Sequence, residues 1–170
     1  MALEIVICGY DEVQEWCWEH DFAQVVSIGE PRTGLPDPLN EDDPSVLRLE
    51  FFDTGAYEYD PVGPQEEDVV ALIEFLDQAV EESRARETED TFVLFHCAQG
   101  VSRSSASALV CMAIALGPGR EQEAVDWLQQ APGGHRASPN TAIVELADDI
   151  LERGGALFAA MEAVYYAGSA

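Results

Sequence analysis

The sequence predicts an α/β fold with a mostly parallel central sheet flanked by helices. Three observations favour it. Short apolar runs rich in β-branched residues dominate the first half of the chain, and longer segments with helical periodicity dominate the second half. The most regular of the apolar runs, residues 91–96, lies between two helical segments. Strands joined by helical crossovers pair in parallel, and such sheets carry their functional loops at the carboxyl ends of the strands.

The first half of the chain predicts three strands and one short helix. Leu3–Cys8 is apolar except for Glu4 and is followed by a glycine, as expected for a buried strand. Residues 11–18 predict a short helix, with Asp11 as its N-cap. Residues 25–28 and 46–52 predict the second and third strands, and the loop between them is rich in proline, glycine and acids.

The remainder predicts helices around one further strand. Residues 53–64 form an irregular stretch of a length that usually has a function in a compact domain. A helix is predicted from Pro64 to Arg86, because acids occupy its first turn and arginines its last. After the strand at 91–96, the segment 104–116 is apolar on nearly all sides and is expected to be a buried helix. Further helices are predicted at 121–130, from Ser138 and Pro139 (as cap and first residue) to Gly154, and at 156–166.

The loop between the strand at 91–96 and the helix at 104–116 has the features of an anion cradle. Backbone N–H groups and the positive end of the helix dipole converge in such a loop. Cys97 begins the loop, and a thiol pKa of about 8.5 falls to roughly 3.5–7.5 in such surroundings. Arg103 supplies a planar fork for two phosphate oxygens, and Gly100 lets the chain turn close to a bound anion. Ser104 is placed to donate a hydrogen bond to the sulfur, and His96 to orient the loop.

The pattern His96-Cys97-x-x-Gly100-x-x-Arg103-Ser104 resembles the Cys-x5-Arg signature of the cysteine-dependent protein tyrosine phosphatase superfamily, in its compact dual-specificity-like branch. The resemblance implies a three-layer sandwich and a reaction without metal or cofactor. It assigns phosphate binding to Ala98, Gln99, Gly100, Val101, Ser102 and Arg103. Gln99 departs from the branch, which usually has a small residue there, and this affects the rim of the pocket more than the backbone cradle. Pro139-Asn140 is a second, weaker match, with Asn140 expected to be a structural hydrogen-bonding residue.

The resemblance also implies a general acid upstream of the cysteine. In the family this acid lies on a loop just after a strand, some forty residues before the nucleophile, and Asp53 matches that place. Asp60, on the same irregular stretch, is the alternative. Either aspartate is also a common turn or cap residue.

Composition restricts the cellular setting and the partners. The 170 residues predict a single domain, 1–170. The net charge is −25 and every one of the eight cations is Arg, so nucleic acid and anionic membranes are not expected partners. Such acidity without Lys suggests a protein of high-salt cytoplasm, which unfolding below about molar salt would support. No basic leader and no apolar run of spanning length occur, so a soluble cytoplasmic protein is expected.

The cysteines have no zinc spacing, and a metal site built from His20 and His135 is not expected.

These features predict a phosphomonoester hydrolase that works through a cysteinyl-phosphate. Because the variable loop positions carry no charge, phosphotyrosine on a protein is the first substrate expected. Phosphoserine or phosphothreonine is the second, and a small phosphorylated metabolite stays open. Two alternatives remain: a rhodanese-like sulfurtransferase and a phosphate-binding module without activity. The sequence leaves the oligomeric state open.

Overall fold

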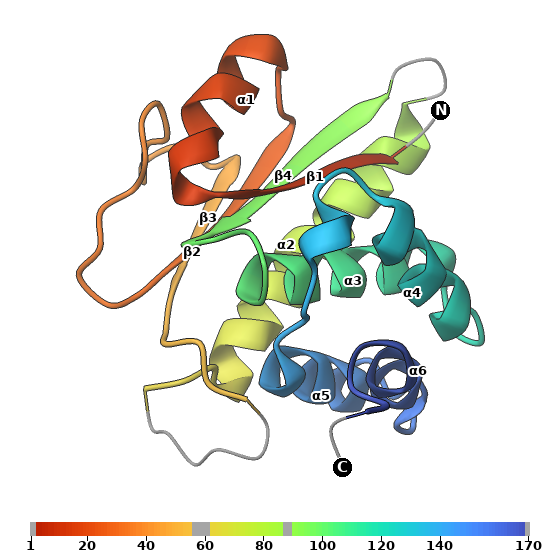
Figure 1. Cartoon of the computed structure of the whole chain (residues 1–170). Helices are drawn as coiled ribbons and strands as arrows, with labels where there is room; N and C mark the ends of the chain where they lie inside the picture. Colours follow the sequence, from red (N-terminus) through yellow and green to blue (C-terminus); the bar gives the residue numbers. More distant parts are fainter. Residues whose placement is uncertain (1–2, 56–61, 87–89, 169–170) are drawn as a thin grey trace.

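The computed structural model describes residues 3–55, 62–86 and 90–168, and these contain a parallel four-stranded sheet (Figure 1). Its strands are β1 (Leu3–Gly9), β2 (Gln24–Gly29), β3 (Val46–Glu50) and β4 (Thr91–Cys97). Their order across the sheet is β1-β4-β2-β3, and all three pairings are parallel. The predicted α/β fold with a mostly parallel sheet is therefore confirmed, and β4 lies inside it.

Helices cover both faces of the sheet, which gives the three layers that the resemblance implied (Figure 1). On one face lie the 3₁₀ turn η1 (Tyr10–Glu12) and α1 (Val13–Glu19). The other face carries α2 (Glu66–Ala85), α3 (Arg103–Leu116), α4 (Glu121–Gln130), the 3₁₀ turn η2 (Gly134–Arg136), α5 (Thr141–Ile150) and α6 (Ala156–Tyr165). Alternate residues of β1 point to the two faces, so that Val6 and Cys8 join the smaller core and Ile5 and Ile7 the larger.

The helix that follows the loop is buried almost throughout, as predicted. Every residue of α3 from Arg103 to Ala113 is buried, including three serines. The helix packs against α2, α4 and α5 as well as against the sheet. Its N-terminus is therefore fixed from several sides, and the loop before it starts from a rigid support.

The predicted capping residues of two helices are wrong. Asp11 lies inside η1 and caps nothing there; the Glu12 carboxylate accepts a hydrogen bond from Gly9 N at 2.7 Å instead. The helix predicted to begin at Ser138 begins at Thr141, and its cap is Asn140, whose Oδ1 accepts from Ile143 N at 3.0 Å. A carboxylate or amide two or three residues from a helix end competes for the same free N–H groups, which single-sequence signals do not resolve.

The predicted third strand is two residues too long, since β3 ends at Glu50. Phe51 N still donates to Gly29 O at 3.0 Å, so the chain leaves the sheet gradually toward Asp53.

In the described part of the chain, no helix combines the length and the apolar character that crossing a membrane requires.

Candidate active site

The loop from Cys97 to Ser102 closes tightly at the carboxyl ends of β1 and β4. Gly100 has a φ of +71°, and a Cβ there would lie 2.5 Å from the backbone carbon of Cys8. Only glycine fits that conformation and that space. Ala98 O accepts from Tyr10 N at 3.1 Å, and Val101 O accepts from Ser138 N at 2.9 Å. The loop is thus held at both sides by its backbone carbonyls.

The sulfur of Cys97 is surrounded by hydrogen-bond donors. Its Sγ lies 3.2 Å from Ser104 Oγ, and the backbone N–H groups of Gly100, Val101 and Ser104 also point to it. Burial opposes ionisation of this thiol, but the hydrogen bonds from Ser104 and from these amides outweigh burial and lower the pKa of Cys97 below its ordinary value. The start of α3 adds the positive end of its dipole. The site therefore stabilises the thiolate form of Cys97 relative to an ordinary cysteine.

The other cysteines show the opposite behaviour. Burial is the main reason that the pKa of Cys111 rises to about 12, and burial likewise raises the pKa of Cys8 and Cys17. No donor counteracts burial at Cys111, which is fully enclosed in α3. Cys97 is therefore the one thiol, among the described residues, with a lowered pKa.

Arg103 is buried beside the loop, and only part of its hydrogen-bonding capacity is used. Its Nη1 donates to Phe51 O at 2.8 Å, which fixes the guanidinium against the end of β3. Its Nε is buried and has no hydrogen-bond partner within the described residues. An unpaired buried donor on a charged group is unfavourable, so this edge of the fork suits an anionic ligand.

Asp53 lies at the mouth of the loop, where two donors hold one of its oxygens. Ser102 Oγ donates to Asp53 Oδ1 at 2.6 Å, and Asn140 Nδ2 donates to the same oxygen at 2.8 Å. Asn140 Nδ2 also reaches Thr54 O at 2.9 Å, while its own backbone N donates to Ser102 O at 3.1 Å. Asn140 is thus the structural hydrogen-bonding residue that the sequence predicted, and it joins the loop of Asp53 to the loop of Cys97.

His96 lies behind the loop, away from the sulfur's donors. It is fully buried, with Nε2 2.6 Å from Ser27 Oγ and Nδ1 3.4 Å from Cys97 O. Burial lowers its pKa to about 4, although the contact with Cys97 O acts in the other direction. His96 is therefore neutral near pH 7 and contacts the backbone of Cys97, and its predicted role in orienting the loop stays a prediction.

The structure brings together Cys97, Arg103, Ser104, Asp53 and His96 around the loop 98–102. The alternative acid, Asp60, lies outside the described residues. Sequence reasoning missed two residues behind the loop, Ser27 and Arg48. The one available signal was a polar residue within each of two apolar strands. Among the described residues, no three His, Cys, Asp or Glu side chains come together as a possible metal site.

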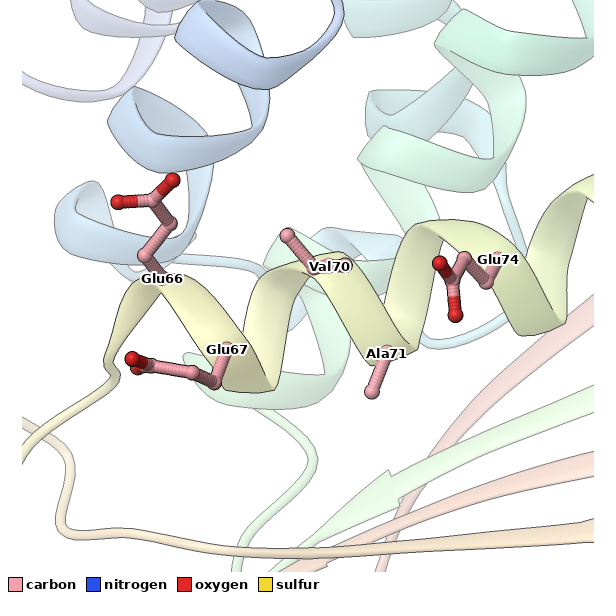
Figure 2. A pocket seen from close by; sticks show the side chains of 5 residues that line it. All are labelled: Glu66, Glu67, Val70, Ala71 and Glu74. Carbon is pink, nitrogen blue, oxygen red and sulfur yellow. The ribbon is translucent and has the colours of Figure 1, made fainter.

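A hollow of about 400 Å³ lies elsewhere, along the N-terminal half of α2 (Figure 2). It is lined by Glu66, Glu67, Val70, Ala71 and Glu74. Three carboxylates make it unsuitable for phosphate, and no residue of the Cys97 loop takes part in it. This acidic hollow is therefore separate from the Cys97 loop and is not a candidate anion site.

No protein-family model and no curated protein matches this sequence. Solved structures do match. The human tyrosine phosphatase-like serine/threonine/tyrosine-interacting protein has a TM-score of 0.60 at 16% identity, over 86% of this chain and 89% of that one. The PTP-2 phosphatase of Cydia pomonella has a TM-score of 0.58 at 16% identity, over 86% and 84%. Human DUSP28 has a TM-score of 0.58 at 15% identity, over 89% and 94%. The chain thus has the compact α/β fold of the dual-specificity and tyrosine phosphatases.

Proposed function

We propose that this protein hydrolyses phosphomonoesters through a cysteinyl-phosphate intermediate. The observation that carries the proposal is the environment of Cys97: a side-chain hydroxyl and three amides lower the pKa of its thiol at the N-terminus of a buried helix. A thiolate is the nucleophilic form of cysteine. The buried, unpartnered Nε of Arg103 beside it supports a dianionic ligand at the same place.

In the first step, the Cys97 thiolate attacks phosphorus, and a sulfur–phosphorus bond forms as the ester oxygen–phosphorus bond breaks. Arg103 and the amides of the loop stabilise the charge on the equatorial oxygens. Asp53 donates a proton to the departing oxygen. Its Oδ1 accepts from Ser102 and Asn140, so Oδ2 is the oxygen that carries this proton.

In the second step, water attacks the phosphorus of the cysteinyl-phosphate while the Asp53 carboxylate accepts a proton from that water. The sulfur–phosphorus bond breaks, inorganic phosphate forms, and the sulfur leaves as a thiolate. Ser104 supports this step, because its hydroxyl lies 3.2 Å from Sγ and stabilises the leaving thiolate. No metal ion or organic cofactor enters either step as we propose it.

For the substrate we propose a single phosphate on a protein, with phosphotyrosine preferred to phosphoserine and phosphothreonine. The exposed loop residues Ala98 and Gln99 are uncharged. On the β1 side of the loop, Arg136 is already paired with Glu12 at 3.1 Å, and on the other side lies Asp53. Substrates that carry several phosphates need additional free cations near the loop, and these surroundings disfavour them.

The first test is turnover of para-nitrophenyl phosphate in metal-free buffer over a range of salt concentrations. We expect activity from the wild type and none from Cys97→Ser or Arg103→Lys, while Cys17→Ser, which removes a thiol outside the loop, keeps full activity. Asp53→Asn should lose about 10²–10⁴-fold with an alkyl phosphate and much less with the nitrophenyl ester, which needs no proton.

Other outcomes would assign another function. Binding of phosphopeptide or vanadate without turnover at any pH would identify a phosphate-binding module. Sulfur transfer from thiosulfate to cyanide without phosphatase activity would identify a sulfurtransferase. Equal rates on phosphotyrosine and phosphoserine peptides would remove the tyrosine preference and leave the chemistry intact.

A further inference from the structure

A row of three polar side chains crosses the sheet behind the Cys97 loop. In the strand register, Ser27 of β2 lies opposite His96 of β4 on one side and opposite Arg48 of β3 on the other. Arg48 Nη1 donates to Ser27 Oγ at 2.9 Å, and Ser27 Oγ lies 2.6 Å from His96 Nε2. Ser27 and His96 are fully buried, and the side chain of Arg48 is only 11% exposed. The row therefore joins the outermost strand to the loop.

The chemistry of the row's two ends determines where its protons lie. Arg48 can only donate, so Ser27 Oγ accepts from it. The Cys97 carbonyl can only accept, so the contact at 3.4 Å requires the proton of His96 on Nδ1. A neutral imidazole with Nδ1 protonated has a free lone pair on Nε2, and Ser27 must therefore donate its hydroxyl proton to that nitrogen. The position of each hydrogen-bonding proton between Arg48, Ser27, His96 and the Cys97 carbonyl is then determined.

The same row affects the direction of the loop amides. His96 binds the carbonyl of Cys97, and Tyr10 N binds the carbonyl of Ala98. In a trans peptide the C=O and the N–H of one unit point in opposite directions. Fixing these two carbonyls toward the α1 side turns the N–H groups of Ala98 and Gln99 to the other side. Two amides thus become available to the anion in addition to the amides that point to the sulfur.

We propose that Arg48 is a positioning residue of the anion cradle. Through the hydroxyl of Ser27 it fixes His96 in the Nδ1–H tautomer, and His96 in turn holds the Cys97 carbonyl out of the cradle. The consequence for catalysis rests on the proposed phosphatase function, whereas the tautomer and anion binding do not depend on turnover.

A purely structural role for Arg48 would act through its second contact. Arg48 Nη2 donates to Thr33 O at 2.6 Å and to Thr33 Oγ1 at 3.0 Å, and Nε lies 3.6 Å from Glu50 Oε1. The contacts with Thr33 hold the loop after β2, the contact with Glu50 stays within β3, and none of them reaches His96. Thr33→Val removes part of that support and leaves the row intact, so it is the matched control.

The groups that face His96 are few, which makes its tautomer a specific readout. They are Ser27 and Arg48 across the sheet, Cys8 in the paired position of β1, and the ring of Tyr10, whose centroid lies 6.2 Å from that of His96. The charged group in this set is Arg48, and the one side-chain hydrogen bond to the ring within the described residues comes from Ser27. A change in tautomer therefore reports on this pair.

The first measurement is a two-bond ¹H–¹⁵N correlation spectrum of the wild type, with ring nitrogens assigned by comparison with His96→Gln. We expect Nδ1 to be protonated and Nε2 unprotonated. Protonation of Nε2 instead would overturn the proposal before any other variant is made. In Ser27→Ala and Arg48→Met we expect a mixture of tautomers, and in Arg48→Lys, whose ammonium still reaches toward Ser27, recovery toward the wild-type pattern.

The second measurement is binding of orthovanadate by calorimetry. Loss of one hydrogen bond behind the cradle should weaken binding about two- to tenfold in Arg48→Met and Ser27→Ala. The double variant should bind vanadate as tightly as the single variant that has the lower affinity, because both substitutions interrupt the same row of hydrogen bonds. Additive losses, or a Thr33→Val variant that weakens binding as much as Arg48→Met, would refute the positioning role. Vanadate bound without phosphatase turnover would refute the proposed function and leave this inference standing.

Discussion

The hydroxyl of Ser104 provides the sharpest test of how the Cys97 thiolate is stabilised. Its Oγ lies 3.2 Å from Sγ, and both atoms are buried. In a Ser104→Ala variant the helix keeps a residue of high helical propensity and the sulfur keeps its backbone donors. The change therefore removes one hydrogen bond and little else, and the pKa of Cys97 should rise.

The magnitude follows from the kind of hydrogen bond that is lost. A bond to a charged group contributes about 1.5–3 kcal/mol, and the lower value applies here because sulfur is a weak acceptor and the backbone donors remain. Since each 1.4 kcal/mol is a factor of ten, the thiolate fraction at a fixed pH below the pKa should fall about tenfold. Turnover should fall further, because the same hydroxyl assists the thiolate as it leaves.

The assay is the pH dependence of Cys97 alkylation by iodoacetamide, which reacts with the thiolate. The control is Ser107→Ala, one turn later in α3, where an equally buried hydroxyl donates its hydrogen bond to Arg103 O at 2.9 Å and not to the Cys97 sulfur. Ser107→Ala should leave the profile unchanged. If Ser104→Ala also leaves it unchanged, the hydroxyl does not stabilise the thiolate, and the backbone amides alone account for the lowering of the Cys97 pKa.

Three further predictions follow from the geometry. Gly100→Ala should lower stability and abolish vanadate binding because its Cβ would overlap the backbone of β1; Gly117→Ala has a similar φ of +85° and open space, so urea unfolding should show only the smaller backbone strain of about 1–3 kcal/mol. Between pH 6.5 and about 4, His96 is protonated in the unfolded chain and stays neutral in the folded protein. The free energy of unfolding should therefore decrease as the pH falls through this range, by up to about 1.4 kcal/mol per pH unit. In urea titrations, His96→Gln should make this dependence on pH weaker. Asp148→Ala should lower the melting temperature because it leaves two backbone N–H groups at the start of α6 without their acceptor, at about 1–3 kcal/mol each, whereas the exposed neighbour Asp149→Ala should not.

Most of the fold could be predicted because its signals are local. The apolar runs of β1 and β2, and the helical period from Pro64 onward, identify elements whose observed bounds differ from the predicted ones by only one or two residues. The first residues of the helices could be predicted less well than the strands. Both Ser138 and Asn140 are good caps, and tertiary contacts made the choice, because Asn140 also binds Asp53 and Thr54.

In the candidate site, too, local contacts could be predicted from the sequence and contacts between distant segments could not. The spacing from Cys97 to Ser104 makes their contact a property of one loop and one helix turn, so the sequence alone could predict it. The row formed by Arg48, Ser27 and His96 depends on strand order and register, and no periodicity in a single sequence specifies which strands become neighbours. The sequence alone therefore gives Arg48 no place near the Cys97 loop, and the pairing of β3 with β2 provides it.

A net charge of −25 is compatible with the proposed phosphate site, because the surface charge and the buried donors act over different distances. At the surface, Arg84, Arg120 and Arg136 each pair with a glutamate, so they offer no attractive field to a distant anion. At the loop, buried Arg103 and the amides act at hydrogen-bond distance, where screening by salt is weak. Beyond about 8 Å in physiological salt the acidic surface is itself largely screened. In the proposed function, the buried donors at the loop therefore determine whether a phosphate is held, and the screened surface charge has little effect on that step.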